Sequence, residues 1–180
     1  MKLKIVKDSN PIMRKRSLPV DLPISKQDKE TLDAMLEHLK LSQDEEYAKK
    51  HNIQAGVGMA AIQIGLLKRM FVIYYQNDDK VIQYQLVNPT ILETSVKKCA
   101  LEAGEGCLSV PKHHEGLVHR YYKIKMKAYD ALQDKDIIIN AVGYDAVVLQ
   151  HEYDHLEGKF YYDRININAP QEKMPGEEII

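Results

Sequence analysis

The sequence is poor in the features that mark secreted and membrane proteins. Only two of its 180 residues are cysteines, Cys99 and Cys107, so at most one disulfide can form. This excludes the disulfide framework of small secreted domains. No apolar run approaches the ~20 residues of a membrane-spanning helix, and the basic segment 1–8 lacks the apolar core of a secretory signal. These absences predict a protein of the reducing cytoplasm with no membrane partner.

The charge of the chain is nearly balanced. Lysine and arginine number 25 against 26 aspartates and glutamates, which gives a formal net charge of −1. Because nucleic-acid binding draws on clustered positive charge, no direct nucleic-acid contact is expected. The length predicts a single catalytic domain over residues 1–180. Within it, the polar segment 166–180, which has two prolines, is expected to be a loosely held tail.

Local patterns predict helices and hairpin strands in separate parts of the chain. Ser25 is a typical N-cap, and apolar residues follow it at helical spacing: Leu32, Met35, Leu36 and Leu39. Strands are predicted at residues 69–76, 81–87, 123–129 and 136–140, with a turn at 77–79. The second strand is expected to stop at Asn88 and Pro89, and a helix over 142–157 is expected to end at Gly158. Because strands and helices do not alternate regularly, the predicted fold class is α+β.

The most informative segment is Gln-His-Glu-Tyr-Asp-His at residues 150–155. Two histidines four residues apart on a helix lie on one face, so His151 and His155 can reach the same metal ion. Glu152, beside the first histidine, can then take a proton from water. Four apolar residues precede the motif and predict a buried helix, where imidazoles and carboxylates need a partner such as a metal. The alternative is a chance match, with two solvated histidines on a surface helix.

Cys107 is the candidate third ligand. It stands in the glycine-rich segment 104–109, and cysteine thiolate is a good ligand for zinc or iron(II). Two alternatives stay open from the residues alone. Cys107 can be a small buried hydrophobe, an interpretation that suits Cys99 better, or a nucleophile with His151 as its base. A nucleophilic cysteine would leave the rest of the histidine motif without a role.

A third segment, Gly-Val-Gly-Met-Ala-Ala-Ile-Gln at residues 56–63, leads into a short alanine-rich helix. Its two glycines allow the main chain to come close to a ligand. A nucleotide-binding loop is not indicated, because neither Gly-x-x-x-x-Gly-Lys nor Gly-x-Gly-x-x-Gly is completed. Taken alone, the segment predicts only a tight loop before a buried helix, with Gln63 capping a backbone group.

Together, in this order and at this spacing, the three segments resemble the three motifs of bacterial peptide deformylases, in particular the longer branch of that family. The likeness covers residues 1–165, and Met59 stands where the family favours leucine. The resemblance implies an α+β fold in which β-sheets surround a central metal-bearing helix, preceded by an N-terminal helix. It also implies hydrolysis of the formyl group from the N-terminal formyl-methionine of new polypeptides, with release of formate.

The resemblance implies a metal-dependent hydrolase. Cys107, His151 and His155 match the ligands of one divalent ion, which is iron(II) in the cell, with nickel, cobalt or zinc able to replace it. Glu152 matches the residue that takes the proton from water and delivers it to the leaving amine.

The family likeness also assigns substrate contacts. The Gln63 side-chain amide and the Leu108 backbone N–H match the groups that stabilise the oxyanion. The backbone of Gly56, Val57 and Gly58 matches a groove wall that pairs with the peptide as an added strand. The implied partners are nascent N-formylmethionyl polypeptides, with the ribosome as their meeting place, and the enzyme is expected to be a monomer.

A further pair is implied beneath the metal. Glu105 and Arg120 match a glutamate and an arginine that support the cysteine-bearing turn in the family. The alternative is two unrelated surface charges. Arg69, a strand-end arginine outside the motifs, is expected to matter little.

Two other functions remain open. A zinc peptidase of the His-Glu-x-x-His type needs a third ligand downstream, and Glu157 follows the motif too closely on the same helix to be an obvious candidate. A structural metal domain needs four protein ligands, with Cys99 as the candidate fourth.

Overall fold

The computed structural model describes residues 3–77 and 80–180. Its helices are α1 (Lys26–Ser42), α2 (Glu45–His51) and α3 (Tyr144–Leu156), with the short 3₁₀ helices η1 (Pro11–Arg14), η2 (Ala61–Ile64) and η3 (Tyr161–Arg164). Its strands are β1 (Gly58–Ala60), β2 (Met70–Asn77), β3 (Lys80–Thr94), β4 (Lys98–Ala100), β5 (Arg120–Tyr121), β6 (Lys123–Asp130), β7 (Lys135–Val142) and β8 (Glu178–Ile179). None of the helices in the described ranges is long and apolar enough to cross a bilayer.

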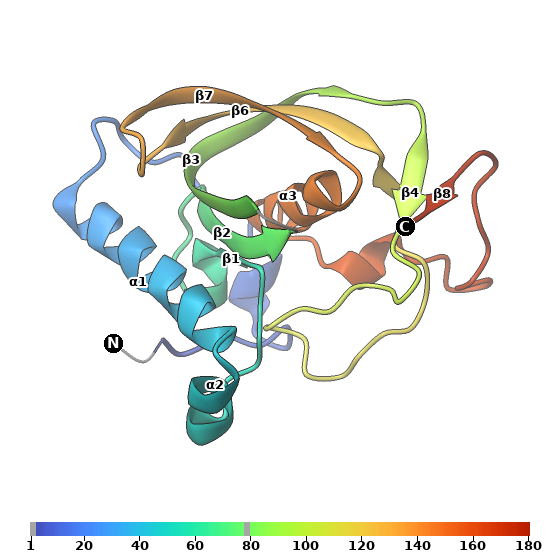
Figure 1. Cartoon of the computed structure of the whole chain (residues 1–180), viewed down its shortest axis with the longest axis horizontal. Helices are drawn as coiled ribbons and strands as arrows, with labels where there is room; N and C mark the ends of the chain where they lie inside the picture. Colours follow the sequence, from blue (N-terminus) through green and yellow to red (C-terminus); the bar gives the residue numbers. More distant parts are fainter. Residues whose placement is uncertain (1–2, 78–79) are drawn as a thin grey trace.

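The strands form two sheets around α3. The larger sheet is antiparallel and has the order β1-β2-β3-β6-β7, and the smaller sheet has the order β5-β4-β8. The large sheet curves over α3, while α1 lies on its other side along β1 and β2 (Figure 1). The predicted α+β class is confirmed, with β-sheets surrounding the motif-bearing helix.

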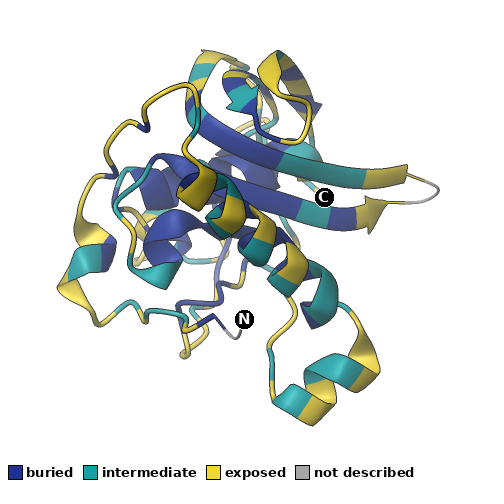
Figure 2. Ribbon diagram, turned by 90° about the vertical axis from the view of Figure 1, so that its left-hand side faces the viewer, coloured by how far each residue is buried: buried dark blue, intermediate teal, exposed yellow. Residues whose placement is uncertain are grey.

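Strand β2 separates two hydrophobic clusters because its side chains alternate between its faces. Phe71 and Ile73 belong to the central core that holds α3, whereas Met70 and Val72 pack with α1. The predicted N-terminal helix is confirmed as α1, and the Ser25 hydroxyl caps it by accepting the Asp28 N–H at 3.1 Å. Figure 2 shows the exposed positions of α1 forming a stripe that faces the solvent.

Strand β3 runs past its predicted end. The strand continues to Thr94, and its pairing with β6 shifts register between Val87 and Thr90. Asn88 takes a φ of +51°, and its side chain bonds both the N–H and the carbonyl of Val20, each at 2.8 Å. A β-bulge therefore absorbs the Asn–Pro pair, so the predicted stop is wrong. The turn predicted at 77–79 includes residues 78–79, which lie outside the described residues.

The C-terminal segment 166–180 is held more firmly than its composition predicted. Its strand β8 pairs in parallel with β4. The Leu117 N–H donates to the carbonyl of Pro170 at 2.7 Å, and the Glu177 carboxylate contacts Nδ1 of His119 at 2.7 Å. The expectation of a loosely held tail is therefore wrong for these residues. The tail instead holds both ends of the long segment between β4 and β5, which carries Cys107.

Candidate active site

Helix α3 places the histidine motif inside the molecule. Four apolar residues on the N-terminal side of the motif are each at most 5% exposed: Ala146, Val147, Val148 and Leu149. Three of them, Ala146, Val148 and Leu149, belong to the central hydrophobic core. Gly158 follows the helix with a φ of +69°, as predicted for its end. A Cβ on Gly158 would lie 2.4 Å from the carbonyl oxygen of Arg14. Glycine is thus required both by the turn and by the close approach of a second chain segment.

The two histidines meet the cysteine on the inner side of α3. The ligand atoms of Cys107, His151 and His155 all lie within 4.8 Å of one another. Cys107 Sγ is 3.2 Å from Nε2 of His155, and Nδ1 of His151 contacts Glu105, which leaves His151 Nε2 for an ion. One thiolate and two imidazoles are a donor set that zinc and iron(II) accept while a fourth position stays open. The three side chains therefore fit one divalent metal ion.

The two cysteines differ in their protonation. Burial raises the pKa of the Cys107 thiol, but the charges and hydrogen bonds of His155 and His151 outweigh burial and lower the pKa to about 5. Cys99 is buried in β4, where burial raises its thiol pKa to about 11. Because the thiolate is the metal-binding form, Cys107 is suited to be a ligand and Cys99 to be a core residue.

Glu152 is aimed at the donor cluster by a contact with β1. A Cβ on Gly58 would lie 2.4 Å from Glu152 Oε1, so only glycine leaves room for this carboxylate. The other oxygen, Oε2, is buried and has no hydrogen-bond partner among the described residues. Burial raises the pKa of Glu152 to about 7, although the neighbouring His151 and His155 charges partly oppose that shift. This carboxyl group can therefore exchange a proton near neutral pH.

Gln63 both caps a turn and faces the cysteine. Its Oε1 accepts the Ala60 N–H at 2.8 Å, which fixes the amide so that its NH₂ group points the other way. That nitrogen lies 3.5 Å from Cys107 Sγ and 3.2 Å from the Ser109 hydroxyl. The capping role expected from sequence is thus present, and the amide donors lie beside the proposed ligand. No acceptor among the described residues takes the Leu108 N–H.

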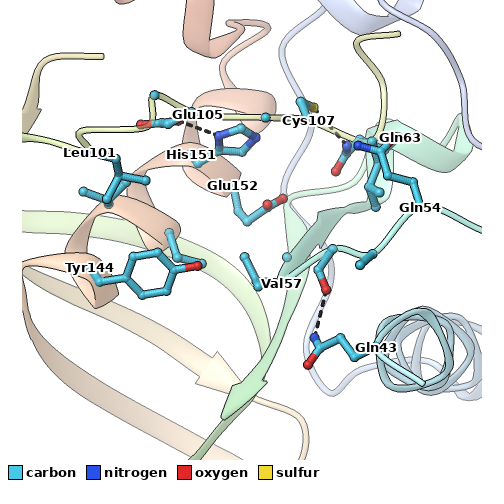
Figure 3. A pocket seen from close by; sticks show the side chains of 18 residues that line it. Gln43, Gln54, Val57, Gln63, Leu101, Glu105, Cys107, Tyr144, His151 and Glu152 are labelled. Atoms are coloured by element: carbon cyan, nitrogen blue, oxygen red, sulfur yellow. Dashed lines mark hydrogen bonds and ion pairs between the residues drawn. The ribbon is translucent and has the colours of Figure 1, made fainter. Parts of the chain in front are cut away.

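A cavity of about 350 Å³ opens in front of these groups. Gly56, Val57 and Gly58 are among the residues that line it. Larger apolar side chains in the lining come from the segment after β4, from the segment around Cys107 and from α3: Leu101, Leu108, Tyr144, Val147 and Val148. Figure 3 shows Tyr144 and Leu101 across the cavity from Gln43 and Gln54, with Glu152 between them.

Glu105 and Arg120 form a buried pair, not two surface charges. Arg120 is 1% exposed and donates from Nε and Nη2 to the two Glu105 oxygens, each at 2.8 Å. Glu105 Oε2 also contacts Nδ1 of His151 at 2.8 Å. Burial raises the pKa of Glu105, but Arg120 outweighs it and lowers the pKa to about 2. The carboxylate thereby orients one histidine of the metal cluster.

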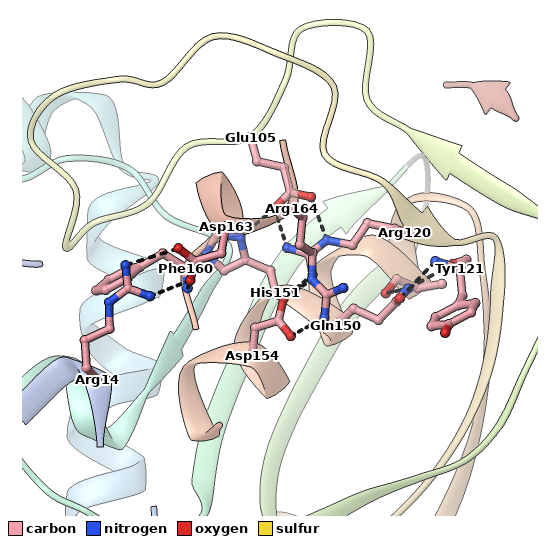
Figure 4. A network of polar contacts seen from close by, with 11 residues as sticks. Arg14, Glu105, Arg120, Tyr121, Gln150, His151, Asp154, Phe160, Asp163 and Arg164 are labelled. Atoms are coloured by element: carbon pink, nitrogen blue, oxygen red, sulfur yellow. Dashed lines mark hydrogen bonds and ion pairs between the residues drawn. The ribbon is translucent and has the colours of Figure 1, made fainter. Parts of the chain in front are cut away.

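Sequence analysis missed the second half of this network. Asp154 bonds Arg120 Nη1 and receives two bonds of 2.6 Å from Arg164 (Figure 4). Asp154 lies within the motif, one helical turn after Gln150, and the sequence indicated that its carboxylate needs a partner without showing which one. No local pattern points to Arg164, because it comes from η3 beyond the helix.

The residues needed for the two alternative functions lie elsewhere. Glu157 pairs with Arg69 Nη1 at 2.6 Å and with Arg16 Nε at 2.9 Å, so it does not join the metal cluster as a peptidase ligand. Cys99 lies in β4 and is not a member of the cluster formed by the described residues. The residues that the structure describes therefore do not form a closed four-ligand site with Cys99.

Comparisons of the sequence with known proteins point to one family. A family model for polypeptide deformylase matches residues 2–171. A peptide deformylase of Staphylococcus epidermidis is 44% identical over 178 residues, which are 98% of this chain and 96% of the relative. One from Macrococcus caseolyticus is 42% identical over 168 residues, which are 92% of this chain and 91% of the relative.

Solved structures give the same result for the fold. A probable peptide deformylase from a Synechococcus phage superposes with a TM-score of 0.74 at 32% identity and covers 91% of this chain and 100% of its own. Peptide deformylase from Thermus thermophilus gives a TM-score of 0.75 at 29% identity over 94% of this chain and 89% of its own. With the motif residues gathered around one cavity and the sequence matched almost from end to end, the chain belongs to the peptide deformylase family.

Proposed function

We propose that the chain hydrolyses the formyl group of N-terminal formyl-methionine with one divalent ion held by Cys107, His151 and His155. Deformylation is the activity of the family to which the chain belongs. The residue assignment is supported above all by one observation: the Cys-His-His donors cluster together, and Cys107 and His151 line the same cavity as the buried carboxylate of Glu152.

The chain's own residues handle the proton. When bound, a divalent ion supplies hydroxide near neutral pH by lowering the pKa of water. Glu152 accepts the proton of that water, and its buried Oε2 has no hydrogen-bond partner among the described residues that would compete. The same carboxyl then delivers the proton to the methionine nitrogen while the C–N bond to the formyl carbon breaks. Burial, which raises the pKa of the Glu152 carboxyl, favours a group that can hold the proton between the two transfers.

Two donors stand ready for the charge that develops on the formyl oxygen. The Gln63 amide is fixed through its oxygen, so its N–H groups need not reorganise during the reaction. The Leu108 N–H follows Cys107 directly and lacks an acceptor among the described residues. We propose that these two groups form the oxyanion hole.

Replacing Gln63 tests this assignment. Gln63→Ala should lower kcat by on the order of 10²–10³ with a smaller effect on KM, as for other oxyanion donors. Gln63→Glu should lose as much, because it keeps the oxygen that caps Ala60 but lacks the N–H donors. A change in KM alone, or full activity of the glutamate variant, would show that Gln63 serves binding or capping only.

The cavity suits the rest of the substrate. Apolar side chains from α3 and the segment after β4 offer walls for the methionine side chain: Leu101, Tyr144, Val147 and Val148. The main chain at Val57 and Gly58 offers an edge along which the peptide can lie as an added strand. We propose nascent formyl-methionyl polypeptides as partners, met at the ribosome, and a monomeric cytoplasmic enzyme that does not itself bind nucleic acid.

Iron(II) is the proposed ion in the cell, with nickel, cobalt or zinc as substitutes. A thiolate next to iron at an open site is exposed to oxidation by dissolved oxygen. The iron-loaded protein should therefore lose activity in air within an assay that leaves nickel- and zinc-loaded protein unchanged, and mass spectrometry should find oxidised Cys107 only in the iron form. Equal loss in all three forms would point to another cause of inactivation.

Formate release from a formyl-Met peptide is the direct test of the function. The matched N-acetyl peptide should remain intact, since the proposed site accepts a formyl group and no larger acyl group is expected to fit. Removal of the metal by a chelator should abolish formate release, and metal addition should restore it. Cleavage of an internal peptide bond without formate release would instead support a peptidase.

A further inference from the structure

The C-terminal end of α1 reaches the substrate groove from behind. Gln43, the C-cap residue of α1, donates from Nε2 to the carbonyl oxygen of Gly56 at 2.9 Å and to that of Tyr74 at 2.7 Å. Ser42, the last residue of the helix, accepts the Gly56 N–H on its hydroxyl at 3.2 Å and donates to the Leu39 carbonyl at 2.7 Å. Figure 3 shows Gln43 directed at the main chain beside Val57. We call these two side chains the α1 clamp.

The α1 clamp occupies both polar main-chain groups of Gly56. The next carbonyl, that of Val57, accepts the Tyr74 N–H at 2.9 Å. Within residues 3–77 and 80–180, no hydrogen bond uses the Val57 N–H. Gly56 is therefore a fixed anchor, whereas Val57, which lines the cavity, keeps an N–H without an acceptor among the described residues. From the family resemblance, the backbone of Gly56 was expected to pair with the peptide as well. In the structure, both main-chain groups of Gly56 are instead bonded to the α1 clamp.

Glutamine suits this position because its amide has two N–H donors on one nitrogen. The carbonyls of Gly56 and Tyr74 come from different segments, one before β1 and one within β2, and a single NH₂ group joins them. Gly56 also lies close to the segment that carries Cys107, since a Cβ on Gly56 would be 3.0 Å from Leu108 Cδ1. A shift of Gly56 would therefore move the groove edge relative to Leu108.

We propose that Gln43 is a positioning residue for peptide binding, which holds the Gly56–Val57 edge where the Val57 N–H meets the main chain of the bound peptide. The inference rests on the proposed function, in which the peptide lies along this edge. Gln43 contacts neither the metal-binding donors nor Glu152 in any hydrogen bond or ion pair of the described residues. Its loss should thus weaken peptide binding and leave the chemical step intact.

Gln43→Met tests the proposal because methionine has a similar length and no N–H donor. With a formyl-Met tripeptide, KM should rise about tenfold while kcat stays within about twofold, as for lost binding that is equal in ground and transition state. With free formyl-methionine, which has no further main chain to pair, kcat/KM should change less than about twofold. Gln27→Met, at an exposed position in the first turn of α1, is the matched control and should behave as the wild type.

A merely structural role predicts another pattern. It would lower the Tm and reduce activity toward the tripeptide and formyl-methionine in equal proportion, which would overturn the proposal. An unchanged KM for the tripeptide would also overturn it. If Gln43→Met does not fold, Ser42→Ala removes the partner of the Gly56 N–H, together with the local bond from Ser42 to the Leu39 carbonyl. This variant should raise the tripeptide KM about threefold, again without effect on formyl-methionine. If the wild type releases no formate from either compound, the proposed function itself falls, and this inference with it.

Discussion

Glu152→Gln is expected to keep its metal and to lose nearly all turnover. Glutamine has the same length as glutamate, so it fits against Gly58, where a Cβ would lie 2.4 Å from the present Oε1. It cannot take a proton from water at neutral pH. General acid–base groups typically contribute about 10²–10⁴-fold, and kcat should fall by that factor. Metal content by atomic spectroscopy and formate release on the same sample give the two readouts.

The outcome separates catalysis from ligation. His151 and His155 stay in place in this variant, so the metal content should equal that of the wild type. Glu102→Gln, an exposed glutamate on the segment after β4, is a suitable control and should retain full turnover. Loss of metal from Glu152→Gln would mean that the carboxylate is a ligand. Turnover near the wild-type rate would mean that another group carries the proton.

The sequence predicted the candidate metal-binding and catalytic residues better than it predicted the residues that hold them in place. His151, Glu152 and His155 are close in the chain, so helical periodicity alone places them together. The assignment of Cys107 as a ligand depended on the family resemblance. The residue patterns alone also allowed Cys107 to be a small buried hydrophobe or a nucleophile. Its lowered thiol pKa arises from histidines on another element, which only the folded chain brings near.

The missed features all depend on contacts between distant segments. Arg164 binds Asp154 from η3, and Gln43 binds two carbonyls from segments that local patterns cannot pair. The bulge at Asn88 needs the Val20 backbone as its partner, so the Asn–Pro pair looked like a strand end. The tail is polar, yet β8 is ordered by the free edge of β4 and not by its own composition.

Arg120→Ala is expected to destabilise the protein and to loosen its metal. Removing one partner of a buried ion pair typically costs roughly 3–5 kcal/mol, since the other charge stays buried without compensation. Asp154 would keep both bonds from Arg164, so Glu105 is the carboxylate that would lose its arginine partner. Glu105 orients His151 through Nδ1, and the variant should therefore show both a lower free energy of unfolding and a lower metal content.

The pH dependence of that loss has a definite sign. The pKa of Glu105 is lowered from 4.5 to about 2 in the folded protein, so the pair stabilises the fold above pH 4.5 and its contribution is lost as the pH falls toward 2. The difference in unfolding free energy between the wild type and Arg120→Ala should be full at neutral pH and should shrink below pH 4.5. Denaturant unfolding at several pH values measures it.

The control arginine must be one whose loss leaves no buried charge. Arg69 was expected from sequence to matter little, but its side chain is only 11% exposed and pairs with Glu157 at 2.6 Å, so it is unsuitable. Arg16 is 74% exposed and shares Glu157 with Arg69, which keeps that carboxylate paired when Arg16 is removed. Arg16→Ala should change stability by no more than about 1 kcal/mol. If Arg120→Ala and Arg16→Ala have the same melting temperature and metal content, Arg120 does not support the cysteine-bearing turn.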